Sequence, residues 1–187
     1  HAKQGGSKEV NNIYHIYNRG VNKGVIFFSD QNYQFFLYKI SLYFRNKAAI
    51  LAYCLMPNHY PLLVQIKSGE FIQKCLQPFL ISYTLSVNRD QDRIGPLFQG
   101  RYQANLIHDD AYLLDCVKYI HLNPVKAGMV KAPQDWRYSS YREYLTQNNK
   151  SFVDISLVMQ FFDSFTELRE FSEGDIENYQ SKYLHED

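Results

Sequence analysis

The chain has 187 residues, of which 45% are hydrophobic and 21% are charged, and its formal net charge is +1. This length suits one domain with a sizeable core and a small extension, and the composition excludes a disordered chain. No apolar run approaches the roughly 20 residues that cross a bilayer, and the first residues lack the apolar stretch of a secretory signal. We therefore expect a cytoplasmic protein without a membrane partner.

Charge is unevenly distributed along the chain. From Glu143 onward the acidic and basic side chains sum to −7, whereas the preceding 142 residues carry +8. A basic body can hold a polyanion through phosphate contacts, and an acidic tail can shield that surface or keep the protein in solution. The three cysteines, Cys54, Cys75 and Cys116, are odd in number and widely spaced, which predicts buried thiols rather than disulfides or a zinc site.

The first part of the chain alternates strand and helix patterns. Residues 10–20 predict a strand that ends in a turn, and residues 31–46, with Ser29 or Asp30 as the N-cap, predict an amphipathic helix. "AAILAYCLM" and "HYPLLVQI" predict two antiparallel strands joined tightly at Pro57-Asn58. A second helix over 71–89 and a strand over 100–108 complete a β-α-β-β-α-β order. This order predicts an α+β, ferredoxin-like fold, with a four-stranded antiparallel sheet and two helices on one face.

Residues 108–124 predict a third helix, capped by Asp109 and ended by Pro124. Helical spacing puts Tyr119 on its presented side, with Asp115 and Asn123 one turn before and after it. The opposite, buried stripe is predicted to hold Leu113, Leu114, Val117, Ile120 and His121. Residues from 152 onward predict small docked helices, so we expect one domain at 1–145 and an acidic helical extension at 146–187.

Tyr119 is a candidate nucleophile. A phenol, with a reference pKa of about 10, is weak near neutral pH but can attack phosphorus when a cation polarises the phosphate. Asn123 offers a carbonyl oxygen to such a cation from the same helix, and His59 offers an imidazole. In a chain with 16 tyrosines, however, the residues alone favour a surface or packing role for Tyr119.

Five motifs, taken in order, favour a catalytic role for Tyr119 over a packing role. They are "YHIYNRG", "YCLMPNHYPLLV", "GPLFQGRYQANLI", "YIHLNPVKAGMV" and "WRYSSYREYL". Over residues 10–145 the chain resembles the single-tyrosine insertion-sequence transposases, and among them the REP-associated tyrosine transposases. The resemblance implies an HUH nuclease that nicks single-stranded DNA beside a hairpin, here a REP-like palindrome. Insertion-sequence members form dimers and REP-associated members are monomers, so the resemblance favours a monomer, with a dimer as the alternative.

The resemblance also assigns roles. Tyr119 matches the nucleophile, which forms a 5′-phosphotyrosine and frees a 3′-OH, and His59 and Asn123 match ligands of Mg²⁺ or Mn²⁺. Pro61 stands where the family has its second histidine. Side chains at i and i+2 of a strand share a face, so position 61 should point with His59 at the metal, yet proline has no lone pair to offer. We therefore expect an impaired metal site, and either a bulge or a lost ladder hydrogen bond at Pro61.

Three other side chains, His15, His121 and Asp115, are candidates to replace the missing ligand, and the sequence does not select among them. We expect His121 to be a core or interface histidine and His15 to lie on the polar face of the first strand. Water can fill vacant positions on Mg²⁺. The alternative to a weakened nuclease is a non-catalytic DNA-binding protein on the same scaffold.

By the same resemblance, a set of basic, polar and aromatic residues is expected to contact DNA phosphates or stack on unpaired bases. They are Asn18, Arg19, Arg101, Lys118, Lys126, Arg137 and Tyr138. Trp136, beside the last two, is expected to be a packing residue. A four-stranded sheet with two helices is also the shape of an RNA-binding RRM, but the chain has no RNP1-like octamer in a strand, which counts against that interpretation.

Overall fold

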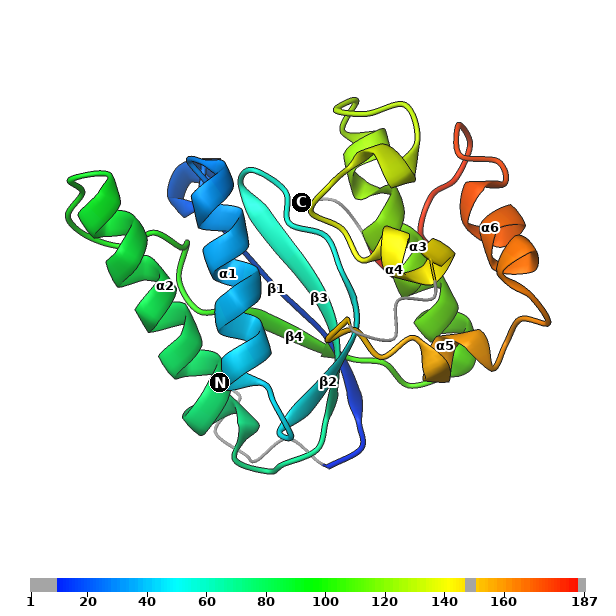
Figure 1. Ribbon diagram of the computed structural model, residues 1–187, viewed down its shortest axis with the longest axis horizontal. Coiled ribbons are helices and arrows are strands. Elements are labelled where there is room, and N and C mark those ends of the chain that lie inside the picture. Colours follow the sequence, from blue (N-terminus) through cyan, green and yellow to red (C-terminus); the bar gives the residue numbers. More distant parts are fainter. Residues whose placement is uncertain (1–9, 147–150, 185–187) are drawn as a thin grey trace.

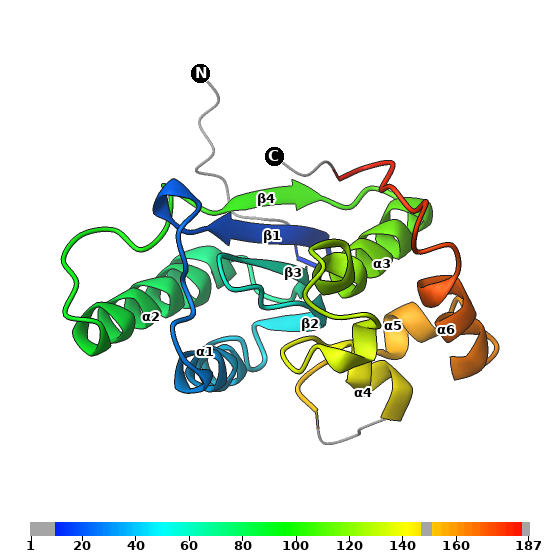
Figure 2. The same cartoon turned by 90° about the horizontal axis from the view of Figure 1, so that it is seen from above.

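The computed structural model describes residues 10–146 and 151–184, and its first elements follow the predicted β-α-β-β-α-β order. They are β1 (Ile13–Arg19), α1 (Asp30–Tyr43), β2 (Ala48–Tyr53), β3 (His59–Ile66), α2 (Gln77–Asp90) and β4 (Gln103–Leu106). The strands form one sheet in the order β2-β3-β1-β4, and every neighbouring pair is antiparallel (Figure 2). The α+β class and the four-stranded antiparallel sheet are confirmed, in an arrangement consistent with a ferredoxin-like fold.

Local chemistry explains where these elements begin. The helix α1 starts after Ser29, whose side chain accepts a hydrogen bond from the backbone N–H of Asn32. The strands β2 and β3 are linked through the two-residue turn Pro57-Asn58, because the Met56 N–H donates to the His59 carbonyl at 2.9 Å. The predicted cap and the predicted tight connection are both confirmed, and the connection places His59 at the first position of β3.

The two faces of the sheet have different neighbours. Strand side chains alternate between faces, so Tyr60 points away from its neighbours His59 and Pro61. Tyr60 is fully buried against Phe36 of α1 and Phe98, with ring centroids 5.2 and 5.6 Å apart. Figure 1 shows α1 and α2 on this side of the sheet, as predicted, and α3 (Asp110–Lys126) with the C-terminal helices on the other. His59 and Pro61 therefore face α3.

The helix α3 is capped as predicted, because the Asp109 side chain accepts from the Tyr112 N–H at 2.7 Å. Its predicted end at Pro124 is wrong, since the helix continues through Pro124 to Lys126. Proline lacks only one intrahelical N–H, a loss that a well-packed helix tolerates near its end. The chain leaves the helix just beyond Lys126, where Gly128 has a φ of +69° and the Gly128 and Met129 N–H groups bond the Val125 and Pro124 carbonyls, both at 2.9 Å.

The second helix differs from its prediction over its first turn. Residues Ile72–Leu76 form a turn of π-helix, and the Gln77 N–H bonds to the Ile72 carbonyl five residues earlier. Pro78 follows directly and has no N–H to bond the carbonyl of Lys74, so regular α-helical bonding cannot extend back across this point. The α-helix proper therefore begins at Gln77.

The C-terminal segment docks on the same core as the sheet. Its helices are α4 (Tyr141–Thr146), α5 (Ser156–Met159) and α6 (Phe165–Glu173). Two short 3₁₀ turns lie elsewhere, at Val21–Lys23 and Pro133–Asp135. Val153, Val158 and Leu168 belong to the main hydrophobic cluster, so the predicted small docked helices are confirmed. The predicted domain boundary at 145/146 adjoins residues 147–150, which lie outside the described residues.

Within the described ranges, no helix has the length and apolar character to span a bilayer. All three cysteines are buried and free, as predicted.

Candidate functional site

Tyr119 and His59 line one cavity of about 250 Å³ between the sheet and α3. The cavity wall also contains His15, Tyr17, Pro61, Asn105, Tyr183 and Leu184. The predicted solvent-side position of Tyr119 is wrong, because the side chain is partly buried and packs against the core. The helix α3 contacts β2 and β3 of the sheet as well as α6, so it is buried on more than one side.

The His59 imidazole is held from both ends. Its Nδ1 lies 2.8 Å from Asn58 Oδ1, and its Nε2 lies 3.1 Å from Asn123 Oδ1. Both partner atoms are amide oxygens, which accept hydrogen bonds, and a neutral imidazole has only one N–H to donate. One of the two contacts therefore brings a ring-nitrogen lone pair against an amide oxygen, an arrangement that a cation between the two atoms would stabilise.

This pair fits a divalent cation. At Mg²⁺–ligand distances of about 2.1 Å, adjacent ligands of an octahedral ion stand about 3 Å apart, which matches the separation of His59 Nε2 and Asn123 Oδ1. Asn123 is 7% exposed, and its amide nitrogen has no hydrogen-bond partner among the described residues. Within those residues no group of three or more His, Cys, Asp or Glu side chains is placed to hold a metal. An ion at this pair would take its other ligands from water or substrate.

Pro61 lies in the same cavity without a bulge. The β1–β3 register runs unbroken past it, with Tyr17 opposite Pro61 and Asn18 opposite Tyr60. The Cys54 N–H donates to the Pro61 carbonyl at 3.2 Å, and the nitrogen and carbonyl of one residue face the same neighbour in an antiparallel ladder. One ladder bond to the Cys54 segment is therefore missing. Of the two predicted consequences, the structure has the lost hydrogen bond.

Of the three candidate replacement ligands, only His15 lines the cavity. Its predicted place on a polar strand face is wrong, because the side chain is 4% exposed. It stacks on Tyr17, with ring centroids 4.7 Å apart, and meets the edge of Tyr119 at 6.3 Å. Burial, with a smaller contribution from the charge of His59, lowers the pKa of His15 to about 4. The imidazole is therefore neutral near pH 7.

The other two candidates point elsewhere. His121 is buried in the core, as predicted, where its Nε2 lies 2.7 Å from Ser140 Oγ, and burial lowers its pKa to about 3. Asp115 accepts hydrogen bonds from the hydroxyl groups of Tyr179 and Ser181 in the C-terminal segment. Neither side chain reaches the cavity that holds Tyr119.

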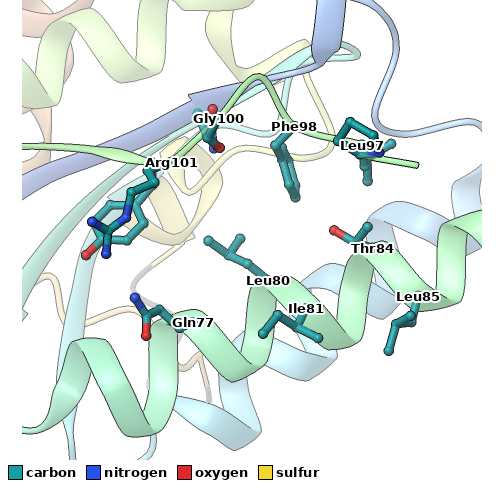
Figure 3. A pocket seen from close by; sticks show the side chains of 12 residues that line it. Gln77, Leu80, Ile81, Thr84, Leu85, Leu97, Phe98, Gly100 and Arg101 are labelled. Carbon is teal, nitrogen blue, oxygen red and sulfur yellow. The ribbon is translucent and has the colours of Figure 1, made fainter.

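Three of the predicted DNA contacts lie near the end of β1. Asn18 is buried and donates to the Gly100 carbonyl at 3.2 Å, and Arg19 Nε lies 3.2 Å from Gln99 Oε1, so both hold the loop before β4. Arg101 is exposed and lines a second cavity of about 430 Å³ between this loop and α2 (Figure 3). Apolar side chains form most of its wall, among them Leu80, Ile81, Leu97 and Phe98. In the β1–β3 register, Arg19 lies opposite His59.

Two predicted DNA contacts are bound by the C-terminal segment. Lys118 Nζ donates to the carbonyls of Phe171 and Gly174 at 2.9 and 2.8 Å. Lys126 Nζ donates to the Tyr179 carbonyl at 2.9 Å. A DNA phosphate would have to replace these carbonyl groups, so the predicted role of both lysines depends on the position of this segment.

Arg137 and Tyr138 lie against the start of α1. Arg137 forms an ion pair with Asp30 at 2.9 Å, and the Tyr138 hydroxyl donates to the same carboxylate. The Tyr138 ring stacks on Tyr33 at 4.0 Å and is 7% exposed, so its faces are closed to an unpaired base in this arrangement. Trp136 donates to the Leu55 carbonyl at 3.0 Å and packs on Tyr33, as expected of a packing residue.

The sequence interpretation missed Asn58, which orients His59, and the cavity residues Tyr17 and Asn105. A signal for Asn58 was present, since it directly precedes the histidine in "MPNHY". A signal for Tyr17 was also present, because Tyr17 lies two residues after His15 and shares its face. Asn105 can be identified as a cavity residue only from the β1–β4 register, which places it opposite His15.

The chain is similar to known proteins in sequence and in fold. No protein-family model matches the chain. A curated protein of Haemophilus influenzae, described as "Putative REP-associated tyrosine transposase", is 32% identical over 101 residues, which cover 49% of this chain and 57% of that protein. The match therefore spans just over half of the relative's own length. A solved structure of a REP-associated tyrosine transposase bound to a REP hairpin has the same fold, with a TM-score of 0.63, 18% identity, and coverage of 83% of this chain and 93% of the other.

Proposed function

We propose that this chain, which is similar in sequence to one REP-associated tyrosine transposase and in fold to another, binds hairpin-bearing single-stranded DNA and cleaves and rejoins it through Tyr119. One observation carries the proposal. Tyr119 and His59, sixty positions apart in the chain, line a single cavity, and Asn123 from the Tyr119 helix contacts the His59 ring. One chain supplies all three groups, which supports a monomer as the active unit.

His59 and Asn123 would hold a Mg²⁺ or Mn²⁺ ion in this proposal. Bound there, the ion would polarise a phosphate oxygen and offset the charge that develops in the transition state. Asn58 contacts the imidazole at Nδ1 while Nε2 meets Asn123, and one turn of helix fixes Asn123 relative to Tyr119. The protein's contribution is therefore the alignment of the phenol with the phosphate.

The reaction exchanges one phosphodiester for another. The Tyr119 oxygen attacks phosphorus and gives up its proton, the bond from phosphorus to the 3′ oxygen breaks, and that oxygen takes up a proton to become a free 3′-OH. The product is a 5′-phosphotyrosine link. Attack of a 3′-OH on this link reverses the step and rejoins DNA, so no external energy source is needed for transposition chemistry.

The strand would reach the cavity along basic groups. Arg19 stands opposite His59 at the end of β1, and Arg101 is exposed in the loop that Asn18 holds. Guanidinium groups bind phosphates in a bidentate manner and fix the register of a strand without reading its sequence. Lys118 and Lys126 would join them where the C-terminal segment releases their ammonium groups.

Pro61 supports a second candidate, a DNA-binding protein with weak or no cleavage. It presents no donor atom in the cavity where the family has its second histidine. Loss of even an outer-shell group typically costs about 10–100-fold in metal affinity or activity, and loss of a ligand should cost at least as much. The proposal therefore includes reduced cleavage relative to chains that carry the histidine.

A labelled single-stranded hairpin oligonucleotide with unpaired flanks separates these functions. The chain is incubated with it and Mn²⁺, and the products are resolved on a denaturing gel. A covalent protein–DNA adduct that chelation of the metal prevents would support cleavage. Tight binding without an adduct, unaffected by chelation, would support the non-catalytic candidate. Preference for the RNA version of the same hairpin would contradict both.

Replacement of Asn58 by alanine is expected to weaken Mn²⁺ binding by about 10-fold, because His59 loses the side-chain contact at Nδ1 that orients its ring. Titration calorimetry with Mn²⁺ measures this change without DNA. Asn88→Ala is the matched control, since Asn88 bonds the Gly95 carbonyl away from the cavity. Equal Mn²⁺ affinity in the two variants would mean that Asn58 does not support a metal ligand.

A further inference from the structure

His15 is a buried polar group without a partner. It is 4% exposed, and neither ring nitrogen has a hydrogen-bond partner among the described residues. A buried donor or acceptor left unpaired costs the fold about 1–3 kcal/mol. A neutral imidazole has one donor and one acceptor nitrogen. The structure thus retains, beside the candidate nucleophile, a group that a ligand would satisfy on both nitrogens.

His15 is badly placed to replace the missing metal ligand. On the shared face of the sheet it lies opposite Leu63, whereas His59 lies opposite Arg19. Along the strand, four residues or about 13 Å separate the two backbone positions, so the two imidazoles enter the cavity on either side of the Tyr17–Pro61 pair. Tyr17 and Pro61 occupy the positions between them. The ligand that satisfies His15 is therefore different from the ion at His59 and Asn123.

The surroundings of His15 define the chemistry of that ligand. The rings of Tyr17 and Pro61 give flat, apolar walls, and Asn105, opposite His15 on the edge strand β4, adds an exposed carboxamide at the rim. Among the described residues, those that line the cavity include no Lys, Arg, Asp or Glu, so no charged side chain among them marks the surroundings of His15 as a site for a charged group. Its volume of about 250 Å³ is below the range of pockets for drug-sized ligands. A flat, uncharged ring with donors and acceptors on its edge meets all of these conditions.

We propose that His15, Tyr17, Pro61 and Asn105 form a pocket for one unpaired nucleobase, next to the phosphate that Tyr119 attacks. The base lies against the Tyr17 and Pro61 rings, and its polar edge bonds the His15 nitrogens, with Asn105 at the opening. Enzymes that act on unpaired nucleic acid read bases by this combination of stacking and edge hydrogen bonds. This inference rests on the proposed function and extends it, since the pocket selects which nucleotide flanks the cleaved bond.

Fluorescence anisotropy tests the pocket without any need for cleavage. Hairpin oligonucleotides carry one abasic site at successive positions of each single-stranded flank, and their affinities are measured for the wild-type chain and for His15→Phe, which keeps an aromatic ring and removes both nitrogens. We expect one flank position at which base removal weakens wild-type binding by about 10-fold, the value of one stacked and hydrogen-bonded base. That penalty should become clearly smaller in His15→Phe, because the hydrogen bonds to the imidazole are lost and only stacking remains, while the other positions keep theirs.

The melting temperature provides a second readout, because removal of an unpaired buried polar group should leave it unchanged or higher in His15→Phe. Tyr38→Phe, an exposed change on α1, is the control and should reproduce the wild-type scan. His15→Asn serves if the phenylalanine variant does not fold. An abasic scan that is the same in the wild type and both His15 variants would overturn the pocket. Absence of any binding to hairpin DNA would instead overturn the proposed function.

Discussion

Replacement of Tyr119 by phenylalanine is expected to abolish the covalent protein–DNA adduct, with a loss of at least about 10³-fold, because the variant lacks the hydroxyl oxygen that we propose becomes the phosphotyrosine oxygen. The ring remains, so its edge contact with His15 and its packing against the core should persist. Anisotropy should therefore show hairpin affinity within about twofold of wild type. The adduct is measured on a denaturing gel with labelled DNA and Mn²⁺.

The control for this change is Tyr38→Phe, which removes a hydroxyl from an exposed tyrosine on the far side of the sheet. It should form the adduct at the wild-type rate. Adduct formation that survives in Tyr119→Phe would assign the nucleophile to another residue. Equal loss of DNA affinity in the variant would point instead to a binding role for the Tyr119 hydroxyl.

Replacement of Pro61 by histidine is expected to raise Mn²⁺ affinity, and adduct yield at limiting Mn²⁺, by about 10–100-fold. The new imidazole would point into the cavity from the same face of β3 as His59, two residues further along the strand. The change also restores a backbone N–H toward the Cys54 segment, whose ladder bond is missing. Calorimetric titration with Mn²⁺ and the adduct gel check the two effects separately.

Pro61→Ala separates the ligand from the backbone. It restores the same N–H without an imidazole, so it should leave Mn²⁺ affinity at the wild-type value. If alanine and histidine raise the adduct equally, the improvement comes from the strand and not from the metal. If histidine changes neither quantity, His59 and Asn123 are not the metal site.

Much of the fold could be predicted because its signals are local. The Ser29 and Asp109 caps, the tight turn at Pro57-Asn58 and the strand patterns each depend on a few neighbouring residues, and all of them appear in the structure. The end of α3 was mispredicted because a general rule about proline was applied at Pro124. The actual stop depends on the left-handed backbone at Gly128, which the same sequence also contains.

The candidate site was only partly predictable, because its remaining features depend on long-range packing. The family pattern identified Tyr119, His59 and Asn123, and the structure brings them together. Helical periodicity placed Tyr119 on the solvent side because it cannot show that a C-terminal segment covers the opposite side of α3. The burial of His15 likewise depends on distant parts of the chain, because the Tyr119 ring meets its edge and Tyr183 and Leu184 line the same cavity.

The proposed nucleophile Tyr119 and the proposed ligand Asn123 are one turn apart on α3, whereas the His59 imidazole belongs to β3. The helix and the sheet meet through side chains, so the geometry of the proposed site depends on how α3 packs against the sheet. A displacement of about 1 Å between reacting groups can reduce a rate by about 10²-fold. Sliding of α3 along the sheet would move the phenol and the amide together away from the imidazole. Both strand cleavage and strand joining would then stop at once, without any change in a catalytic residue.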